Sequence, residues 1–313
     1  MKKIIVLLPL ILLFFLPVTH YASSPSDQKV KLRLNLKEGD VFQIHTQIDQ
    51  DISQVLMGQP QNITQSIGVY YQFKVLEVKG KLYSVEVLYT RTSFDTDGLL
   101  GSVHYDSQEN PEEIPPTAIG YAAMVGQTFN MVVNAKGEVK AISGLDQLLD
   151  HMLAVFSEKY PGSSSAMADR LKKQYGDKNM MATMQQMMAI YPNQKVGIGD
   201  QWEKRYVINT GFPLEVANTY KLAELTDGEA KIEVFSTIAS DPTEPVDMNS
   251  FVFNYEVAGH QEGTLTLNTA NGWTTESSVN QELSGEVTMN GESLPDPQTW
   301  PISMSTKNKL KSN

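Results

Sequence analysis

Few side chains in this sequence are of the kind that nucleophilic or metal chemistry requires. The chain has no cysteine, and no two of its five histidines lie at metal-ligand spacing. It has no Gly-x-Ser-x-Gly turn that would expose a nucleophilic serine. The histidines are His20, His45, His104, His151 and His260. We therefore predict no metal, no cofactor and no catalytic residue, and interpret the protein as a non-enzyme.

Two short patterns resemble parts of functional motifs. Ser26-Asp27-Gln28-Lys29 has the Ser-x-x-Lys spacing of β-lactamase-type enzymes, but the other boxes of that motif set are missing. Asp95-Thr96-Asp97-Gly98 has the alternating acids of a calcium loop, but lacks the third acid and the closing glutamate. We interpret the second pattern as an acidic turn in a long solvated loop over residues 95–117.

The strongest candidate for ligand binding is a row of methionines in a predicted helix. Met180, Met184, Met187 and Met188 fall on one helical face, and Trp202 follows near the start of a predicted strand. Methionine side chains are flexible and polarisable, so such a face can adapt to varied apolar ligands. The same face could instead cover a sheet as ordinary core. Both interpretations stay open, and these five residues form the predicted ligand-binding site.

Alternating side chains predict the strands that would frame this site. The first strand has its apolar residues at even positions, namely Phe42, Ile44, Thr46, Ile48, Ile52 and Leu56. Turns near 57–62 and 79–81 lead to further strands over 67–75 and 83–89. Short turns between long strands favour an antiparallel meander, which a strand pair over 129–139 extends.

The period changes to about 3.6 residues at Ser143 and returns to two after residue 194. Helices are predicted over residues 143–160, 165–175 and 177–191. Alternation then continues from Trp202 to Leu283, with Asn271-Gly272 as the clearest hairpin turn. The predicted fold class is α+β, predominantly antiparallel β, with two curved sheets or half-barrels and an intervening helical segment; one large split sheet is the alternative. The predicted regions are a signal peptide (1–22), an N-terminal β lobe (23–142), the helical segment (143–194) and a C-terminal β lobe (195–313).

The two β lobes share a short pattern at the start of a strand. Gly39-Asp40-Val41-Phe42 resembles Gly199-Asp200-Gln201-Trp202. Either the lobes arose by duplication, or a glycine and a polar residue before an aromatic are a common way to begin a strand.

The first residues have the order of a secretory signal peptide. Lys2 and Lys3 precede 15 mainly apolar residues, Ile4 to Val18, and cleavage is expected after Ala22. A helix that spans a membrane needs roughly 20 such residues, so we predict an exported protein, periplasmic or secreted, with no transmembrane segment in the mature chain. Without cysteine it has no lipid-anchoring thiol and no disulfide.

The charge of the chain argues against one class of partner. Loss of Lys2 and Lys3 would change the formal net charge from −11 to −13. A surface of that charge repels nucleic acid and anionic lipid heads, so no nucleic-acid partner is predicted.

Several segments carry a resemblance to a known family. They are residues 32–40 (LRLNLKEGD), 71–75 (YQFKV), 125–129 (VGQTF), 134–139 (NAKGEV) and 197–202 (GIGDQW). In these segments the chain is similar to a family of uncharacterised exported bacterial proteins, over nearly all of the chain after residue 22. The resemblance implies an extracytoplasmic address and supplies no catalytic residue.

The expected architecture is similar to that of periplasmic lipid and lipoprotein carriers, whose half-open barrels hold acyl chains. By this analogy we predict a non-catalytic protein that binds an apolar or lipid-like ligand or a lipidated partner, in an elongated cavity lined by Met184, Met187 and Met188. The alternative is an envelope scaffold that works through protein contacts.

Overall fold

The computed structural model describes residues 29–56, 58–98, 101–109, 111–159, 171–172, 175–209, 212–241, 243–248, 251–291, 294 and 296–313. The signal peptide predicted over residues 1–22 lies outside these residues, as does most of the helix predicted over 165–175. No helix in the described part of the chain is both long and apolar enough to cross a membrane.

The described elements are mostly strands, and the described helices lie between β4 and β7 in the chain. Their order is β1 (Val41–Leu56), β2 (Gln59–Lys79), β3 (Leu82–Gly98), β4 (Gly101–Asp106), η1 (Pro116–Ala118), α1 (Ile119–Met124), β5 (Thr128–Asn134), β6 (Val139–Ser143), α2 (Leu145–Lys159), α4 (Asp177–Met188), β7 (Gln201–Asn209), β8 (Pro213–Leu225), β9 (Glu229–Ser240), β10 (Val246–Met248), β11 (Phe251–Asn268), β12 (Thr274–Gly291) and β13 (Gln298–Ser312).

The strands form one antiparallel sheet, so two separate sheets are wrong and the alternative of one large sheet holds. Its order is β6-β5-β3-β2-β1-β13-β12-β11-β9-β8-β7, with β4 added to β3 and β10 to β11. The N-terminal and C-terminal strands join because β13 pairs with β1, from Ile44 opposite Ser312 to Gln54 opposite Ile302. The predicted class, mostly antiparallel β with helices between two β-rich parts, is confirmed.

The first part of the stretch predicted as a solvated loop, up to residue 106, contains strand. β3 continues through Asp95 and Asp97, and β4 pairs back onto it. Phe94 and Tyr105 lie opposite each other and are both buried. The acids alternate with these apolar residues, so they mark one face of a strand and not a loop.

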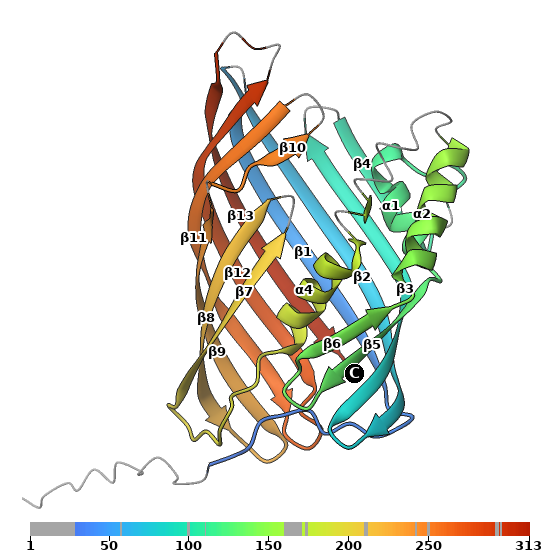
Figure 1. Cartoon of the computed structure of the whole chain (residues 1–313), viewed down its shortest axis with the longest axis vertical. Helices are drawn as coiled ribbons and strands as arrows, with labels where there is room; N and C mark the ends of the chain where they lie inside the picture. Colours follow the sequence, from blue (N-terminus) through green and yellow to red (C-terminus); the bar gives the residue numbers. More distant parts are fainter. Residues whose placement is uncertain are drawn as a thin grey trace, which may run out of the picture.

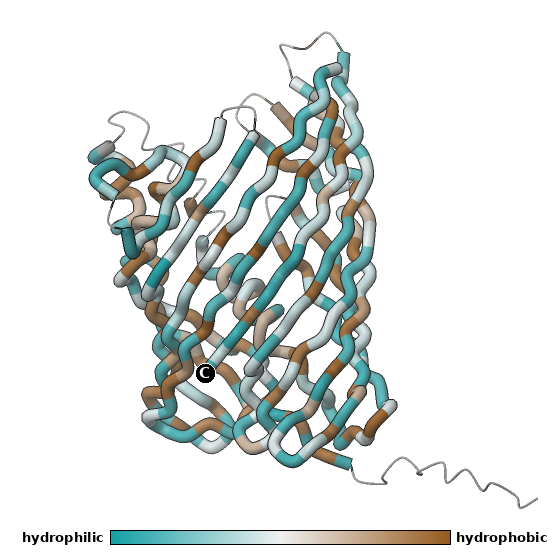
Figure 2. The backbone as a smooth tube through the Cα atoms, turned by 180° about the vertical axis from the view of Figure 1, so that it is seen from behind, coloured by the Kyte–Doolittle hydropathy of each residue, from teal (hydrophilic) through white to brown (hydrophobic). Residues whose placement is uncertain are grey.

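The sheet curls around α4 into an open trough, as Figure 1 shows. We call the face toward α4 the concave face and the opposite face the convex face. Glycine allows β11 and β12 to approach closely within the curled sheet, because a Cβ atom at Gly263 in β11 would overlap the carbonyl oxygen of Ser278 in β12. Seen from behind in Figure 2, hydrophilic and hydrophobic residues alternate along the strands of the convex side.

The lower end of the trough in Figure 1 is closed by the segment before β1. Leu32, Leu34 and Leu36 in this segment are buried. The backbone N–H of Leu34 donates to Ala135 (2.9 Å), and that of Asn35 donates to Asn271 (2.8 Å). These bonds connect the segment to the turns after β5 and β11. Because its three leucines belong to the main core, that core lies at this end of the trough.

Candidate functional site

The predicted methionine face belongs to the core at the lower end of the trough. Met180, Met184 and Met188 are buried on the side of α4 that faces the sheet, and Met187 is partly buried against the same core. Beside them is a cavity of only about 20 Å³, lined by Leu34, Ile44, Phe73, Met187, Met188, Tyr191, Trp273, Thr274 and Leu310. A space of this size holds about one water molecule, so the elongated cavity expected at the methionines is absent at this place.

Trp202 helps to hold α4 between the two edge strands of the sheet. Its indole Nε1 donates to the carbonyl oxygen of Ile190 (2.7 Å), and the hydroxyl of Tyr206 donates to that of Ala189 (2.7 Å). On the other edge, the backbone N–H of Val139 in β6 donates to Oε1 of Gln185 (2.8 Å). The structure therefore places Trp202 beside the methionines, in contacts that fix the helix.

The two faces of the sheet differ in charge. Strand pairing puts the aspartates, glutamates, arginines and histidines of the described strands on the convex face. The lysines of these strands lie there too, with one exception, Lys204 in β7. Lys204 shares the concave face with Trp202 and Tyr206 on either side of it. Among the described strand positions the concave face thus carries a single charge, which is positive.

One row of strand partners on the concave face is polar. We call this set the polar row: Thr96, Gln65, Gln50, Thr306, Gln281, Gln261, Ser236, Asn218 and Lys204. Each member pairs with the next across neighbouring strands, from β3 through β1 and β13 to β7. Burying so many polar groups is unfavourable unless they are hydrogen-bonded or reach water, so the row requires an explanation.

Part of the polar row is buried and internally bonded. Nε2 of Gln261 donates to Oγ of Ser236 (2.9 Å) and Oδ1 of Asn218 (3.3 Å), and Ser236 also donates to Asn218. Nδ2 of Asn218 donates to the hydroxyl of Tyr220 (3.0 Å). These four residues therefore satisfy each other's hydrogen-bonding groups on the concave side of β8, β9 and β11.

The rest of the polar row is more accessible, except for Thr306, which is buried. Gln65 donates to Gln50, whose Nε2 donates to Oγ1 of Thr306 (3.2 Å). Gln281 lies next in the row, is half-buried, and has no hydrogen-bond partner for its side chain among the described residues. Its amide is free to bond to water or to another molecule.

Apolar side chains flank the polar row on both sides. Toward the lower end lie half-buried Ile67 and Val279, which border the main core. Toward the upper end lie half-buried Met304, Ile302 and Tyr255, which border two smaller clusters. The first of these clusters contains Ile208, Phe212, Leu214, Val216, Ile238, Val257 and Leu283, and the second contains Val287, Met289 and Trp300. The concave face therefore offers apolar, polar and again apolar surface.

Lys204 sits at one end of the polar row with no hydrogen bond or ion pair to a described residue. Burial lowers its pKa, because the charged ammonium loses part of its hydration. Glu138 and Lys136, in the connection after β5, act on that pKa in opposite directions. The Glu138 carboxylate already accepts bonds from Lys140 (2.7 Å) and Asn134 (2.8 Å).

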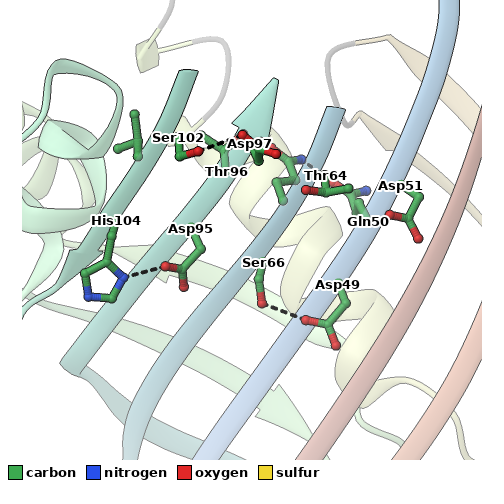
Figure 3. A pocket seen from close by; sticks show the side chains of 12 residues that line it. Asp49, Gln50, Asp51, Thr64, Ser66, Asp95, Thr96, Asp97, Ser102 and His104 are labelled. Atoms are coloured by element: carbon green, nitrogen blue, oxygen red, sulfur yellow. Dashed lines mark hydrogen bonds and ion pairs between the residues drawn. The ribbon is translucent and has the colours of Figure 1, made fainter. Parts of the chain in front are cut away.

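The convex face carries an acidic hollow of about 510 Å³, shown in Figure 3. Two rows of side chains border it: Asp49, Ser66, Asp95 and His104 in one, and Asp51, Thr64, Asp97 and Ser102 in the other. The hollow arises because short Ser66 and Thr64 stand between longer neighbours. The sequence has no local signal for this hollow, because its residues come together only when β1, β2, β3 and β4 pair.

Within the acidic hollow, the acids are held by neutral or basic neighbours. Oγ of Ser66 donates to Asp49 (2.7 Å), and Oγ of Ser102 donates to Asp97 (2.7 Å). His104 bridges Asp95 and Glu109, and these hydrogen bonds raise its pKa, with Asp95 the larger cause. In the described residues, no group of three or more histidine, aspartate or glutamate side chains is arranged to hold a metal ion.

Comparison with known proteins gives a family but no function. A protein family described as "Family of unknown function (DUF6263)" matches residues 80–274, which is more than half of the chain. The chain belongs to this family. The DUF6263 match runs from β3 to the turn before β12 and includes α4 and the Lys204 end of the polar row. It confirms the resemblance to an uncharacterised family and does not bear on export.

Two solved structures have a low level of similarity to this DUF6263 protein. The translocator domain of the autotransporter NalP from Neisseria meningitidis is 7% identical, with 89% of this chain and 90% of that chain covered and a TM-score of 0.22. An outer membrane channel from Pseudomonas putida F1 is 9% identical, with 93% and 99% covered and a TM-score of 0.25. TM-scores this low do not establish a common fold. No curated protein matches the sequence.

Proposed function

We propose that this protein is a non-catalytic binding protein for an apolar or lipid-like molecule, which lies on the concave face beyond α4. The observation that carries the proposal is the composition of that face: apolar side chains that remain accessible, a row of neutral polar groups, and one charge. Because burying a charge is costly, a face kept almost free of charge suits contact with an apolar molecule.

The proposal moves the binding surface away from the methionines. Met184 is 1% exposed, whereas Ile67, Val279, Met304 and Ile302 keep partial access. A chain-like apolar ligand would cover these side chains and place any polar group against the polar row. Burial of apolar area contributes roughly 25 cal/mol per Å², so a ligand of this kind would gain most of its affinity there.

We also propose that the protein works outside the cytoplasm. The support is the signal-like order of residues 1–22, with two lysines, an apolar stretch and Ala22. Cell fractionation with an antibody against the chain, and N-terminal sequencing of the mature protein, would test this. Cytosolic protein that retains Met1 would contradict it.

A dye-binding assay tests the concave surface directly. We expect the uncharged fluorescent probe N-phenyl-1-naphthylamine to brighten on binding, and Met304→Glu to abolish this because the new carboxylate lies among apolar side chains. Ser303→Glu is the matched control, because Ser303 is the neighbouring, exposed residue on the convex face. Equal dye binding by the two folded variants would contradict the proposed surface.

Identification of the natural ligand requires protein from its own cells. The full chain should be purified without detergent, extracted with organic solvent and analysed by mass spectrometry. An apolar molecule recovered from the wild type but not from Met304→Glu would support the proposal.

The scaffold alternative has less support in the structure. Phe235 is 50% exposed and Val207 60% exposed, both on the convex face. They occupy different rows of strand partners, and single exposed apolar residues are common on protein surfaces. A role in protein contacts stays a prediction.

A further inference from the structure

Lys204 is the one charged strand residue of the described chain that faces the concave side. A role for Lys204 in recognition requires that the concave face binds a ligand, and so it rests on the proposed function. Arg205, the next residue, faces the opposite way and is exposed near Glu203 (4.0 Å). The two basic neighbours on one strand therefore differ in what they can reach.

Among the described residues, no carboxylate forms an ion pair or a hydrogen bond with the ammonium group of Lys204. The side chain is half-buried and its partner across the strand pair is Asn218, a neutral member of the polar row. Glu138 influences it only at a distance and is already bonded to Lys140. An ammonium that has lost hydration without gaining a counter-ion is a favourable partner for an anionic oxygen.

The rest of the concave face suits the apolar part of a ligand whose anionic group contacts Lys204. From Lys204 the polar row runs past Asn218 and Gln261 toward Gln281, whose amide is free. Half-buried apolar side chains lie on both sides of it. An amphipathic molecule with its head at Lys204 would extend its chain past the buried members Asn218, Ser236 and Gln261 to reach the accessible apolar side chains.

We propose that the ligand is a single-headed anionic amphipath, a carboxylate or phosphate with an apolar chain, and that Lys204 binds its anionic head. The acids of the described strands lie on the convex face, so the anionic head meets none of these carboxylates on the concave side. A neutral amphipath of the same chain would lose only the head contact. The preference for the anionic ligand over the neutral one therefore measures the contribution of Lys204 to binding.

The test compares hexadecanoate with hexadecanol as competitors of the bound dye at neutral pH. Charge-assisted hydrogen bonds are worth roughly 1.5 to 3 kcal/mol, so we expect the wild type to prefer the acid by about tenfold or more. Lys204→Gln should bring the two competitors to equal affinity, and Lys204→Arg should keep the preference. Arg205→Gln, the matched control on the convex face, should behave as the wild type.

The outcomes separate the two proposals. Equal displacement by acid and alcohol in the wild type would overturn the anionic head while leaving apolar binding intact. Displacement by neither competitor, or no dye binding at all, would overturn the proposed function itself. An undiminished preference in Lys204→Gln would overturn the role of Lys204, and thermal unfolding would verify that this variant is folded.

Discussion

The concave and convex faces are built from the same strands by the same alternation, yet they have opposite chemistry. The convex face carries nearly all charges of the described strands, including the acidic hollow and the ion pair between Arg91 and Asp106. The concave face is mainly apolar, and the polar row crosses it. Alternation alone explains a charged outside and an apolar inside. It does not explain an inward row of amides and hydroxyls.

The difference also separates residues that hold the fold from residues that are free to bind. At the lower end the concave face is sealed by α4 and by the segment with Leu32, Leu34 and Leu36. Beyond α4 the same face retains partial access at Ile67 and Met304. The main core therefore lies at one end of the trough, and the proposed binding surface lies beyond it. Substitutions on the two faces should accordingly have unequal effects.

The largest effect is expected from neighbouring residues of β8 that face opposite sides. Leu222 is fully buried on the concave face, and Lys221 pairs with Glu233 on the convex face (3.0 Å). Leu222→Ala should lower the free energy of unfolding by about 2 to 5 kcal/mol, because it leaves a cavity. Lys221→Ala should change it by about 0.5 kcal/mol or less, since exposed ion pairs contribute little. Urea denaturation would show whether the losses differ in this way.

A smaller loss is expected in the buried part of the polar row. Asn218→Ala removes the partner of Ser236, Gln261 and Tyr220. Leaving such groups unsatisfied should cost about 1 to 3 kcal/mol in the free energy of unfolding. Thr219→Ala, the convex neighbour, serves as the control in the same urea titration. If Asn218→Ala is as stable as the control, the hydrogen-bonded network does not contribute to the fold.

Much of the fold follows from local patterns in the sequence. The alternation from Phe42 onward, the hairpin at Asn271-Gly272 and the helix with Met184 all appear where the sequence predicts them. The single sheet does not follow, because it depends on pairing between residues far apart in the chain, such as Ile44 with Ser312. β13 was also missed, although Ile302, Met304 and Leu310 alternate there with polar residues.

The candidate site was hidden for a related reason. In the first strand Gln50 interrupts the inward apolar pattern, and the sequence of this strand alone gives no reason for the interruption. Only strand register shows that Gln50, Gln281 and Asn218 interrupt their strands at the same level. The methionines, in contrast, gave a clear local signal, and the structure uses them in the core.

On the convex face, the Arg91–Asp106 pair should contribute about 1 kcal/mol, reduced by its partial exposure to water. The hydrogen bond from Arg91 is the main cause that lowers the pKa of Asp106 below its usual 3.8. A lowered carboxyl pKa stabilises the fold above the usual value and loses that contribution as pH falls through the lowered one. Asp106→Asn should thus be less stable than the wild type near neutral pH and equal to it in strong acid. Asp97→Asn, at an exposed acid of the same face, is the control.

The smallest effect is expected at His104, which is exposed on the acidic hollow. The hydrogen bond to Asp95 is the main cause that raises its pKa above the usual 6.5. A raised histidine pKa stabilises the fold fully below the usual value, and this contribution disappears as pH rises through the raised one. Because the group is exposed, His104→Gln should cost about 0.5 kcal/mol or less at about pH 5 and nothing at about pH 9. NMR titration of the imidazole should show its pKa falling toward 6.5 in Asp95→Asn. An unchanged pKa in that variant would show that the acids of the convex face do not interact with His104, and would weaken the contrast between the two faces.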